Sequence, residues 1–323
     1  MKNFKKHPFI SPKSKNKLKF IDGQFKFRNE TYFLINEIPD LTYPKKLDKI
    51  DQVARNFYDG RADAYENNMH LTFKTHNVDE TKTRQSFIDL LNIDKGNKVL
   101  DIACGTGRDS EIIANNLGDN GVIVSLDISS DMLRVCKNKF ENKKISNFQC
   151  IANASNLPFP DNYFDATYSF GGLGEFANIK ESLAEMVRVT KVGGKVVVGD
   201  ESMPTWLRGT YFDKVLTTTN PQFSEKVPLN QIPVEAREFT LRYVINQVFY
   251  LFDFVVGEGE PTANFDFIIP GVRGGTYRSR YEGTLESVSP EVKKSFIEHI
   301  SKKGANRYDW LNNVISDAIN NDK

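Results

Sequence analysis

The sequence contains little cysteine and no long hydrophobic run. Its three cysteines among 323 residues, Cys104, Cys136 and Cys150, lack the even number and the paired spacing of a disulfide scaffold or a cysteine zinc site. The longest apolar stretch, residues 248–256, is interrupted by Asp253 and is far shorter than the ~20 residues of a membrane-spanning helix. The basic N-terminus is not followed by the apolar core of a secretory signal. We therefore expect a cytoplasmic protein with no membrane span and no metal site.

Acidic residues are absent from the first 20 positions, which contain seven lysines, although the whole chain has a net charge of only +1. The rest of the chain is therefore slightly acidic. Proteins that bind nucleic acid usually carry a basic face on their folded body, so this distribution disfavours a nucleic-acid partner. Blocks of like charge are usually solvated. We predict that residues 1–45 form a basic tail and a small hairpin arm, with the first 20 residues flexible.

Short apolar runs alternate with amphipathic segments through the middle of the chain. Strands are expected at residues 98–103, 121–126, 147–151, 164–169 and 194–199, and helices at 47–68, 81–91, 109–117, 130–140, 179–187 and 205–216. Two further strand-like runs, 239–245 and 248–256, are followed by a Gly/Arg-rich segment and terminal helices at 290–303 and 308–319. Strands separated by helical segments indicate crossover units of a parallel sheet. The fold class is therefore α/β.

The segment VLDIACGTGRDS, Val99–Ser110, carries the strongest chemical signal. An apolar strand leads to Asp101, and a turn containing Gly105 and Gly107 lets backbone N–H groups approach a ligand closely. Asp127 follows the next strand, where a carboxylate can accept both hydroxyl groups of a ribose. A dinucleotide site is disfavoured because Ser110 occupies the position of its third glycine. The pattern predicts a nucleotide-type cofactor of another kind.

The spacing D-x-x-x-G-x-G resembles motif I of class I S-adenosylmethionine-dependent methyltransferases. Three further segments resemble the ubiquinone/menaquinone-type branch of that family: FYDGRADAY (Phe57–Tyr65), IANASNLPFPDNYFDATYSF (Ile151–Phe170) and MVRVTKVGGKVVVGDES (Met186–Ser202). The resemblance implies a Rossmann-like, doubly wound, seven-stranded sheet with a reversed last strand. It also implies a methyltransferase domain at residues 46–256, with a substrate lid at about 203–237 and a C-terminal helical extension at 257–323.

The same resemblance implies S-adenosylmethionine as the cofactor. The residues carried over to its site are Tyr58, Asp101, Ala103, Gly105, Gly107, Asp127, Ile128, Met132, Asn153, Ala154 and Phe170. Asn153 stands where the family usually has an aspartate beside the adenine amino group. Because an asparagine carbonyl also accepts hydrogen bonds, we expect cofactor binding to survive this change.

Three residues are candidate general bases for methyl transfer by in-line displacement. Glu175 and Glu201 follow the fourth and fifth strands, where ligands of open α/β sheets lie, and His70 follows the FYDGRADAY segment. Each carboxylate has an alternative role in fixing the local turns. The region between the fifth and sixth strands is rich in aromatic residues, and in this family it forms the substrate lid, which favours a small apolar or aromatic methyl acceptor.

Two basic or ribbon-like segments leave further roles open. Arg273, Arg278 and Arg280 lie on a glycine-rich loop, where they can bind a carboxylate or phosphate of the substrate or pair with nearby acids. The N-terminal FRNETYFLINEIPDLTYP resembles the end of a small zinc-ribbon-like element, but no cysteine precedes Cys104. Two other functions therefore remain open, RNA methylation and S-adenosylmethionine binding without catalysis. The oligomeric state is also open.

Overall fold

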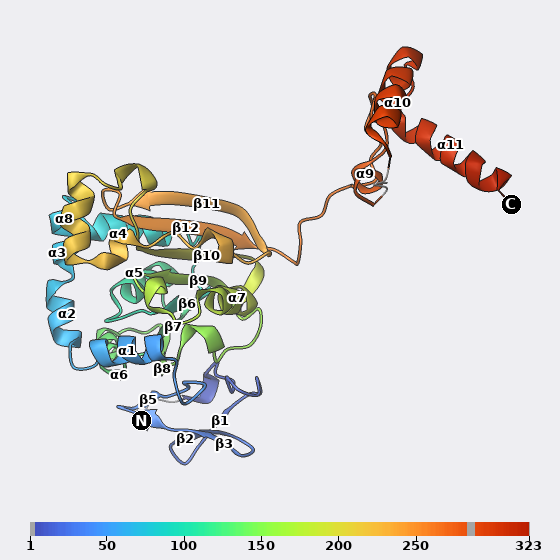
Figure 1. Cartoon of the computed structure of the whole chain (residues 1–323). Helices are drawn as coiled ribbons and strands as arrows, with labels where there is room; N and C mark the ends of the chain where they lie inside the picture. Colours follow the sequence, from blue (N-terminus) through green and yellow to red (C-terminus); the bar gives the residue numbers. More distant parts are fainter. Residues whose placement is uncertain (1–3, 283–287, 323) are drawn as a thin grey trace. The chain divides into compact units, whose positions relative to one another are not determined.

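The computed structural model describes residues 4–282 and 288–322, which belong to two compact units, Met1–Glu260 and Pro261–Lys323. The first unit contains the sheet (Figure 1). The residues that line the two pockets described below also belong to it. The second contains helices α9 (Tyr277–Glu282), α10 (Pro290–Lys303) and α11 (Arg307–Asn321). In that unit Phe296 of α10 packs against Trp310 of α11, with ring centroids 5.3 Å apart. None of the helices within the described residues is long and apolar enough to cross a bilayer.

The large sheet of the described chain has seven strands in the order β11-β12-β10-β9-β6-β7-β8. Their bounds are β6 (Lys98–Ile102), β7 (Val122–Asp127), β8 (Ser146–Ile151), β9 (Phe164–Phe170), β10 (Thr190–Glu201), β11 (Ala236–Val244) and β12 (Phe249–Val256). Strands β8, β7, β6, β9 and β10 pair in parallel, and β12 runs antiparallel to both β10 and β11. The expected Rossmann-like sheet with a reversed last strand is therefore confirmed.

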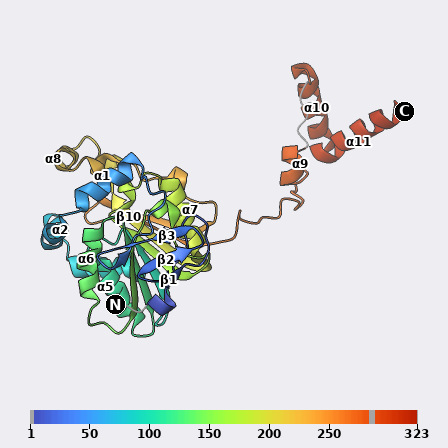
Figure 2. The same cartoon turned by 90° about the horizontal axis from the view of Figure 1, so that it is seen from below.

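The two faces of the sheet bury separate hydrophobic clusters because successive side chains of a strand point to opposite faces. In β12, Phe252 and Phe254 belong to one cluster and Leu251 to the other. Helices α4 (Glu80–Asp89), α5 (Arg108–Leu117) and α6 (Ser130–Lys139) supply residues to the cluster of Leu251. Helix α7 (Ile179–Val189) supplies the other cluster and lies across the sheet from α5 and α6 (Figure 2). The sheet is thus covered on both sides, as its apolar strands require.

The N-terminal segment also covers the face of α7, so the expectation of a flexible tail is wrong. Phe9 is fully buried, and its ring lies 6.0–6.1 Å from the rings of Phe148 and Phe159. The backbone N–H of Ile10 donates to the carbonyl of Pro158 at 2.9 Å. The connection between β8 and β9 contains only the short helix η2 (Ala154–Asn156), and the N-terminal segment fills the space beside it. The apolar residues of the tail therefore pack in spite of the surrounding lysines.

The rest of the N-terminal segment forms short antiparallel strands. They are β1 (Lys19–Ile21), β2 (Gln24–Phe27) and β3 (Glu30–Tyr32) in one small sheet, with β4 (Leu34–Ile35) and β5 (Ile38–Pro39) in another, after the short helix η1 (Phe4–Lys6). The N–H of Leu41 donates to the carbonyl of Ile151 in β8 at 2.8 Å. The expected hairpin is thus part of a larger element that is joined to the edge of the main sheet.

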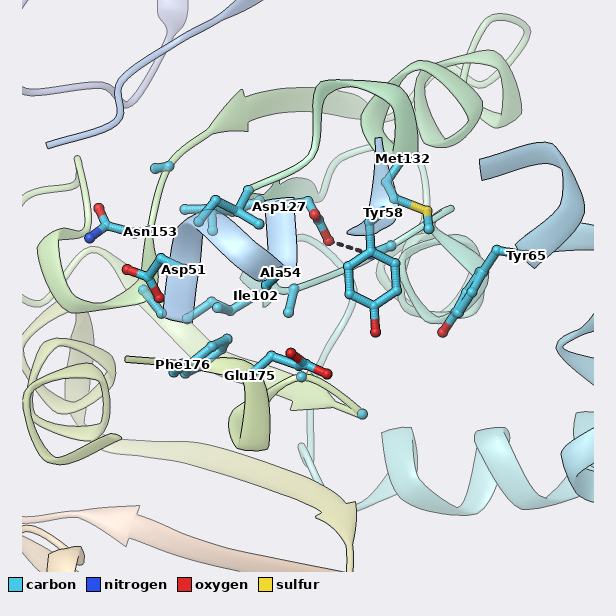
Figure 3. A pocket seen from close by; sticks show the side chains of 18 residues that line it. Asp51, Ala54, Tyr58, Tyr65, Ile102, Asp127, Met132, Asn153, Glu175 and Phe176 are labelled. Carbon is cyan, nitrogen blue, oxygen red and sulfur yellow. Dashed lines mark hydrogen bonds between the residues drawn. The ribbon is translucent and has the colours of Figure 1, made fainter. Parts of the chain in front are cut away.

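The single helix expected at residues 47–68 is divided. It forms α1 (Lys49–Tyr58) and α2 (Ala62–Asn68), and α3 (His70–Thr75) follows directly. The break lies at Gly60, whose φ of +78° is strained for residues with a Cβ. As a result Tyr58 and Tyr65 come from different helices and lie side by side at one cavity (Figure 3).

The connection from β10 to β11 forms several short helices. They are η4 (Thr205–Leu207), α8 (Tyr211–Thr219), η5 (Pro221–Ser224) and η6 (Leu229–Gln231). The helix expected at 205–216 therefore begins later, because Thr210 caps α8 by accepting a hydrogen bond from the N–H of Asp213. Strands β11 and β12 then form the expected hairpin.

Candidate functional site

The glycine turn after β6 is built from residues with left-handed backbone angles. Ala103, Gly105 and Gly107 have φ values of +54°, +53° and +80°. Gly105 lines both of the pockets described below, whereas Gly107 lines neither and is the N-cap residue of α5. A Cβ atom at Gly107 would lie 2.5 Å from Sγ of Cys136. Gly107 therefore permits the close packing of the turn against α6, and Gly105 is the glycine beside the ligand space.

Asp127, at the end of β7, is held in place by the backbone. The N–H of Gly105 donates to Oδ2 at 2.8 Å and the N–H of Ser129 donates to Oδ1 at 2.9 Å (Figure 3 draws the first of these). The side chain is only 7% exposed. Burial raises the pKa of this carboxyl to about 6, although the two backbone donors oppose the shift. The carboxylate is thus fixed and ready to accept hydroxyl groups from a ligand.

Asp101 is the second buried carboxyl at this edge of the sheet. Oγ of Ser110 donates to its Oδ2 at 2.5 Å, and Ser110 also hydrogen-bonds Ser125 at 2.8 Å. Burial, followed by the nearby charge of Asp109, raises its pKa well above the ordinary aspartate value. A cationic group of a ligand would stabilise the ionised form, because an opposite charge favours ionisation.

The first pocket lies between α1, the glycine turn and the ends of β7, β8 and β9. It encloses about 620 Å³, including its open mouth. Of the residues predicted to bind the cofactor, eight line it: Tyr58, Ala103, Gly105, Asp127, Ile128, Met132, Asn153 and Ala154. Asp101 and Phe170 line the second pocket instead. The motifs therefore converge in space, with the exception of Gly107.

One end of the first pocket holds two polar side chains, Asn153 and Asp51 (Figure 3). Nδ2 of Asn153 donates to Oγ of Ser155 at 3.1 Å, but its buried Oδ1 has no hydrogen-bond partner in the described chain. The sequence analysis missed Asp51. This residue lies on α1, and nothing in the local sequence shows that its side chain faces the same cavity as Asn153, which is distant in the sequence. The N–H of Ala177 donates to its Oδ1 at 3.0 Å. Within the described chain, this end of the pocket therefore contains a buried acceptor, Oδ1 of Asn153, to which no group donates.

Helix α1 and the turn after it are held at the site by hydrogen bonds to the loop after β7 and to the first turn of α6. Nε of Arg55 donates to the carbonyl of Ile128 at 2.9 Å. Oδ2 of Asp131 accepts from the N–H groups of Gly60 and Ala62 at 3.1 and 3.3 Å. Both contacts connect the helices that carry Tyr58 and Tyr65 to the strand end that carries Asp127. The tyrosines are therefore held in place over the glycine turn.

The second pocket adjoins the first and encloses about 810 Å³, including its open mouth. Its apolar lining comes from five segments, with Met69, Phe73, Phe170, Ile245 and Phe249 as members. Its lining also contains five ionisable acidic and basic side chains, those of Arg84, Asp101, Arg108, Asp109 and Glu201. The two pockets share Tyr58, Tyr65, Ala103, Gly105 and Gly171 in their walls. The glycine turn and the two tyrosines therefore form the junction between the two pockets.

The three candidate bases lie in different places. Glu201 lines the second pocket, and burial together with neighbouring Asp200 raises its pKa well above the ordinary glutamate value. Glu175 lines the first pocket and accepts a hydrogen bond from Nε2 of Gln222 at 2.6 Å. His70 is exposed at the start of α3 and is absent from the lining of both pockets. The structure therefore brings Glu175 and Glu201 to the joined pockets and leaves His70 outside them.

The predicted arginine cluster belongs to the second unit. Arg278 pairs with Asp266 at 2.8 Å, and the guanidinium of Arg280 donates to the carbonyl of Gly274 at 2.8–2.9 Å. Arg273 is exposed. Within residues 4–282 and 288–322, no group of three or more His, Cys, Asp or Glu side chains is arranged to hold a metal ion.

Comparison with known families decides the relationship. The model of the ubiE/COQ5 methyltransferase family matches residues 46–219, more than half of the chain. The chain belongs to this family. The match contains the glycine turn, Asp127, Asn153 and both tyrosines, so the residues that build the first pocket lie within the family domain. The resemblance inferred from the motifs is confirmed.

The matches to individual relatives span only part of each relative's length. A demethylmenaquinone methyltransferase of Geobacillus sp. (strain WCH70) is 37% identical over 139 residues, which cover 43% of this chain and 58% of the relative. The ubiquinone/menaquinone biosynthesis C-methyltransferase UbiE of Cupriavidus necator is 33% identical over 170 residues, 53% of this chain and 66% of the relative. The chain thus spans about three-fifths of the length of these curated relatives. Among solved structures, phosphoethanolamine N-methyltransferase 2 of Haemonchus contortus superimposes with a TM-score of 0.49 at 13% identity, covering 68% of this chain and 62% of that one.

Proposed function

We propose that this chain is an S-adenosylmethionine-dependent methyltransferase that acts on a small quinone-type molecule. The observation that supports the proposal is the pair of joined pockets with Gly105 and the two tyrosines at their junction. Methyl transfer needs a donor and an acceptor to meet in line, and two pockets that share a wall provide such a meeting point. The names of the similar family members, which are quinone biosynthesis methyltransferases, favour a quinone-type acceptor.

The residues of the first pocket fit S-adenosylmethionine, which supplies an activated methyl group when it is bound. Asp127 would hold the ribose hydroxyls, and Asp101, which lines the second pocket, would hold the ammonium group of the methionine part where it passes the junction. Ile128 and Ala154 supply apolar surface for the flat faces of the base. The unpartnered Oδ1 of Asn153 supports this fit, because it requires a donor that the adenine amino group can supply.

The second pocket suits a flat hydroxylated ring. Phe73, Phe170 and Phe249 offer aromatic faces, and Glu201 offers a polar group among them. Because burial and Asp200 favour the neutral form of Glu201, this side chain would donate a hydrogen bond to an oxygen of the acceptor. Transfer would break the bond between sulfur and the methyl carbon, whose electron pair stays on sulfur, and form a bond from the acceptor to that carbon. The proton that the acceptor loses would pass to solvent. Orientation of the reacting atoms supplies ~7–11 kcal/mol of such a barrier.

The connection between β10 and β11 would serve as the lid of the second pocket. Gln222 of η5 lines this pocket and donates to Glu175, which lines the first. The hydrogen bond therefore links the lid to the loop after β9 at the boundary between donor and acceptor. We also propose that the reaction takes place in the cytoplasm, since the three cysteines are all free thiols, as in a reducing compartment.

The proposal is tested by incubating the full chain with methyl-labelled S-adenosylmethionine and a short-chain demethylmenaquinol. We expect the label in a methylated quinol together with one equivalent of S-adenosylhomocysteine. Binding of S-adenosylhomocysteine without turnover of any quinol would contradict the proposed reaction and would favour a binding protein without catalysis. Labelling of RNA in place of the quinol would support the RNA methyltransferase that the sequence left open.

A further inference from the structure

We propose that Asp51 and Asn153 together accept the two N–H bonds of an adenine amino group, and that Asp51 sets the preference for a 6-amino over a 6-oxo purine. The inference rests on the proposed function in one respect, namely that the first pocket takes an adenosyl group. It concerns a residue of α1 that the sequence motifs do not include.

The carboxylate of Asp51 has a fixed orientation. Asp51 lies in the first turn of α1, is only 7% exposed and lines the first pocket. The N–H of Ala177, from the loop after η3 (Leu173–Glu175), donates to its Oδ1 at 3.0 Å. Burial raises its pKa, while the hydrogen bonds from Ala177 and from the side chain of Asn153 oppose that shift. A buried carboxylate held in this way at the end of a pocket is an acceptor for a ligand.

The amide of Asn153 also has a defined orientation. Its Nδ2 donates to Oγ of Ser155 and interacts with Asp51, so its Oδ1 is the atom that lacks a partner. The side chain is only 5% exposed. A buried acceptor without a hydrogen bond is destabilising, and native proteins rarely leave one without water or a ligand. The two side chains lie next to each other at the end of the pocket that is remote from Tyr65 (Figure 3).

Two neighbouring acceptors select a group that carries two donors. A primary amine on an aromatic ring has both donors on one atom, and adenine carries such an amine at position 6. A 6-oxo purine would present an acceptor to both oxygens instead. Ile128 and Ala154 line the same pocket with apolar surface that suits a flat ring. Sites built to hydrogen-bond a particular group reject analogues that lack it far more strongly than apolar pockets do.

The test measures binding of S-adenosylhomocysteine and S-inosylhomocysteine to the full chain by calorimetry. The wild-type protein should prefer the adenosyl ligand by ~100-fold. In Asp51→Asn the amide oxygen would take the N–H of Ala177 and turn its NH₂ group toward the ligand amine. We therefore expect this variant to lose ~10-fold or more in affinity for the adenosyl ligand, with little loss for the inosyl ligand.

Asp48→Asn is the matched control. Asp48 caps the same helix by accepting from the N–H of Ile50 at 3.0 Å, and it is exposed. Asparagine caps helices equally well, so both affinities should stay within about twofold of wild type. The double variant Asp51→Asn/Asn153→Asp places an amide at 51 and a carboxylate at 153, and it should regain most of the adenosyl preference.

The outcomes separate this inference from the proposed function. If wild type binds S-adenosylhomocysteine but shows no preference over the inosyl ligand, the inference fails and the proposed function stands. Equal loss of both ligands in Asp51→Asn, with no recovery in the double variant, also overturns it, because a purely structural role predicts that pattern. If wild type binds neither ligand, the proposed function itself fails and the inference fails with it. Because Asn153 alone would also give a wild-type preference, the role of Asp51 is decided by its variants; where Asp51→Asn does not fold, the double variant takes its place in the comparison.

Discussion

The two pockets of the first unit are built in different ways. The first presents oxygen acceptors whose positions are fixed by backbone N–H groups, as Asp127 and Asp51 show. The second combines aromatic side chains from several segments, such as those of Phe170 and Phe249, with ionisable side chains that include Glu201. Fixed acceptors recognise one arrangement of donors, whereas the aromatic faces in the second pocket select by shape. The difference indicates that a constant cofactor belongs in the first pocket and the variable methyl acceptor in the second.

The largest effect that we expect from a single substitution is on ligand affinity in the first pocket. Asp127→Ala should weaken S-adenosylhomocysteine binding ~100-fold or more, because two hydrogen bonds to a charged acceptor are lost and each is worth ~1.5–3 kcal/mol. Calorimetry measures the change, and Asp119→Ala, an exposed aspartate in the loop before β7, is the control. Unchanged affinity in Asp127→Ala would remove this carboxylate from the ligand site.

Glu201 tests the second pocket with a smaller effect. Glu201→Ala should raise the KM for the quinol ~10-fold and leave S-adenosylhomocysteine affinity unchanged, because the side chain donates to the acceptor and not to the cofactor. Glu201→Gln should keep most of the activity, since its amide NH₂ replaces the neutral carboxylic acid as donor. If the glutamine variant loses kcat as severely as the alanine variant, Glu201 acts as a base and the neutral-donor role is wrong.

The pH dependence of cofactor binding should follow the ionisation of Asp127 in the first pocket and not that of Glu201 in the second. The pKa of Asp127 in the free protein is raised to about 6, and ribose hydroxyls would stabilise its ionised form. Affinity for S-adenosylhomocysteine should therefore be highest above pH 6 and decline as the pH falls through 6, by ~4-fold between pH 7 and 5.5. Glu201→Gln should show the same profile. An affinity that rises as the pH is lowered would contradict this assignment.

The N-terminal segment should affect neither pocket, although it contributes to the core. Phe9→Ala should lower the free energy of unfolding by ~3–5 kcal/mol, because a fully buried ring is removed. Phe33→Ala, at 57% exposure in the same segment, should change it by less than ~0.5 kcal/mol. Ligand affinities of the folded variants should stay within twofold. Denaturant unfolding that shows no difference between the two variants would restore the flexible-tail expectation.

The parts of the molecule that the sequence predicted depend on local patterns. Strands β6 and β7 and the glycine turn follow from apolar runs and glycine spacing within a few residues. The packing of Phe9 depends on Phe148 and Phe159, which are distant in sequence, so its isolated position among lysines gave no signal. Asp51 was missed for a similar reason, because its partner Ala177 lies on another element. Interactions between distant segments are therefore what the sequence analysis could not supply.

The central claim is that the first pocket holds the cofactor and directs its sulfur toward the second. A crystal structure of the full chain with S-adenosylhomocysteine tests it most directly. The account predicts the ribose hydroxyls on Asp127, the adenine amino group between Asp51 and Asn153, and the sulfur at the junction formed by Tyr58, Tyr65 and Gly105. An adenosyl group in the second pocket beside Phe249, or a first pocket without ligand, would contradict it.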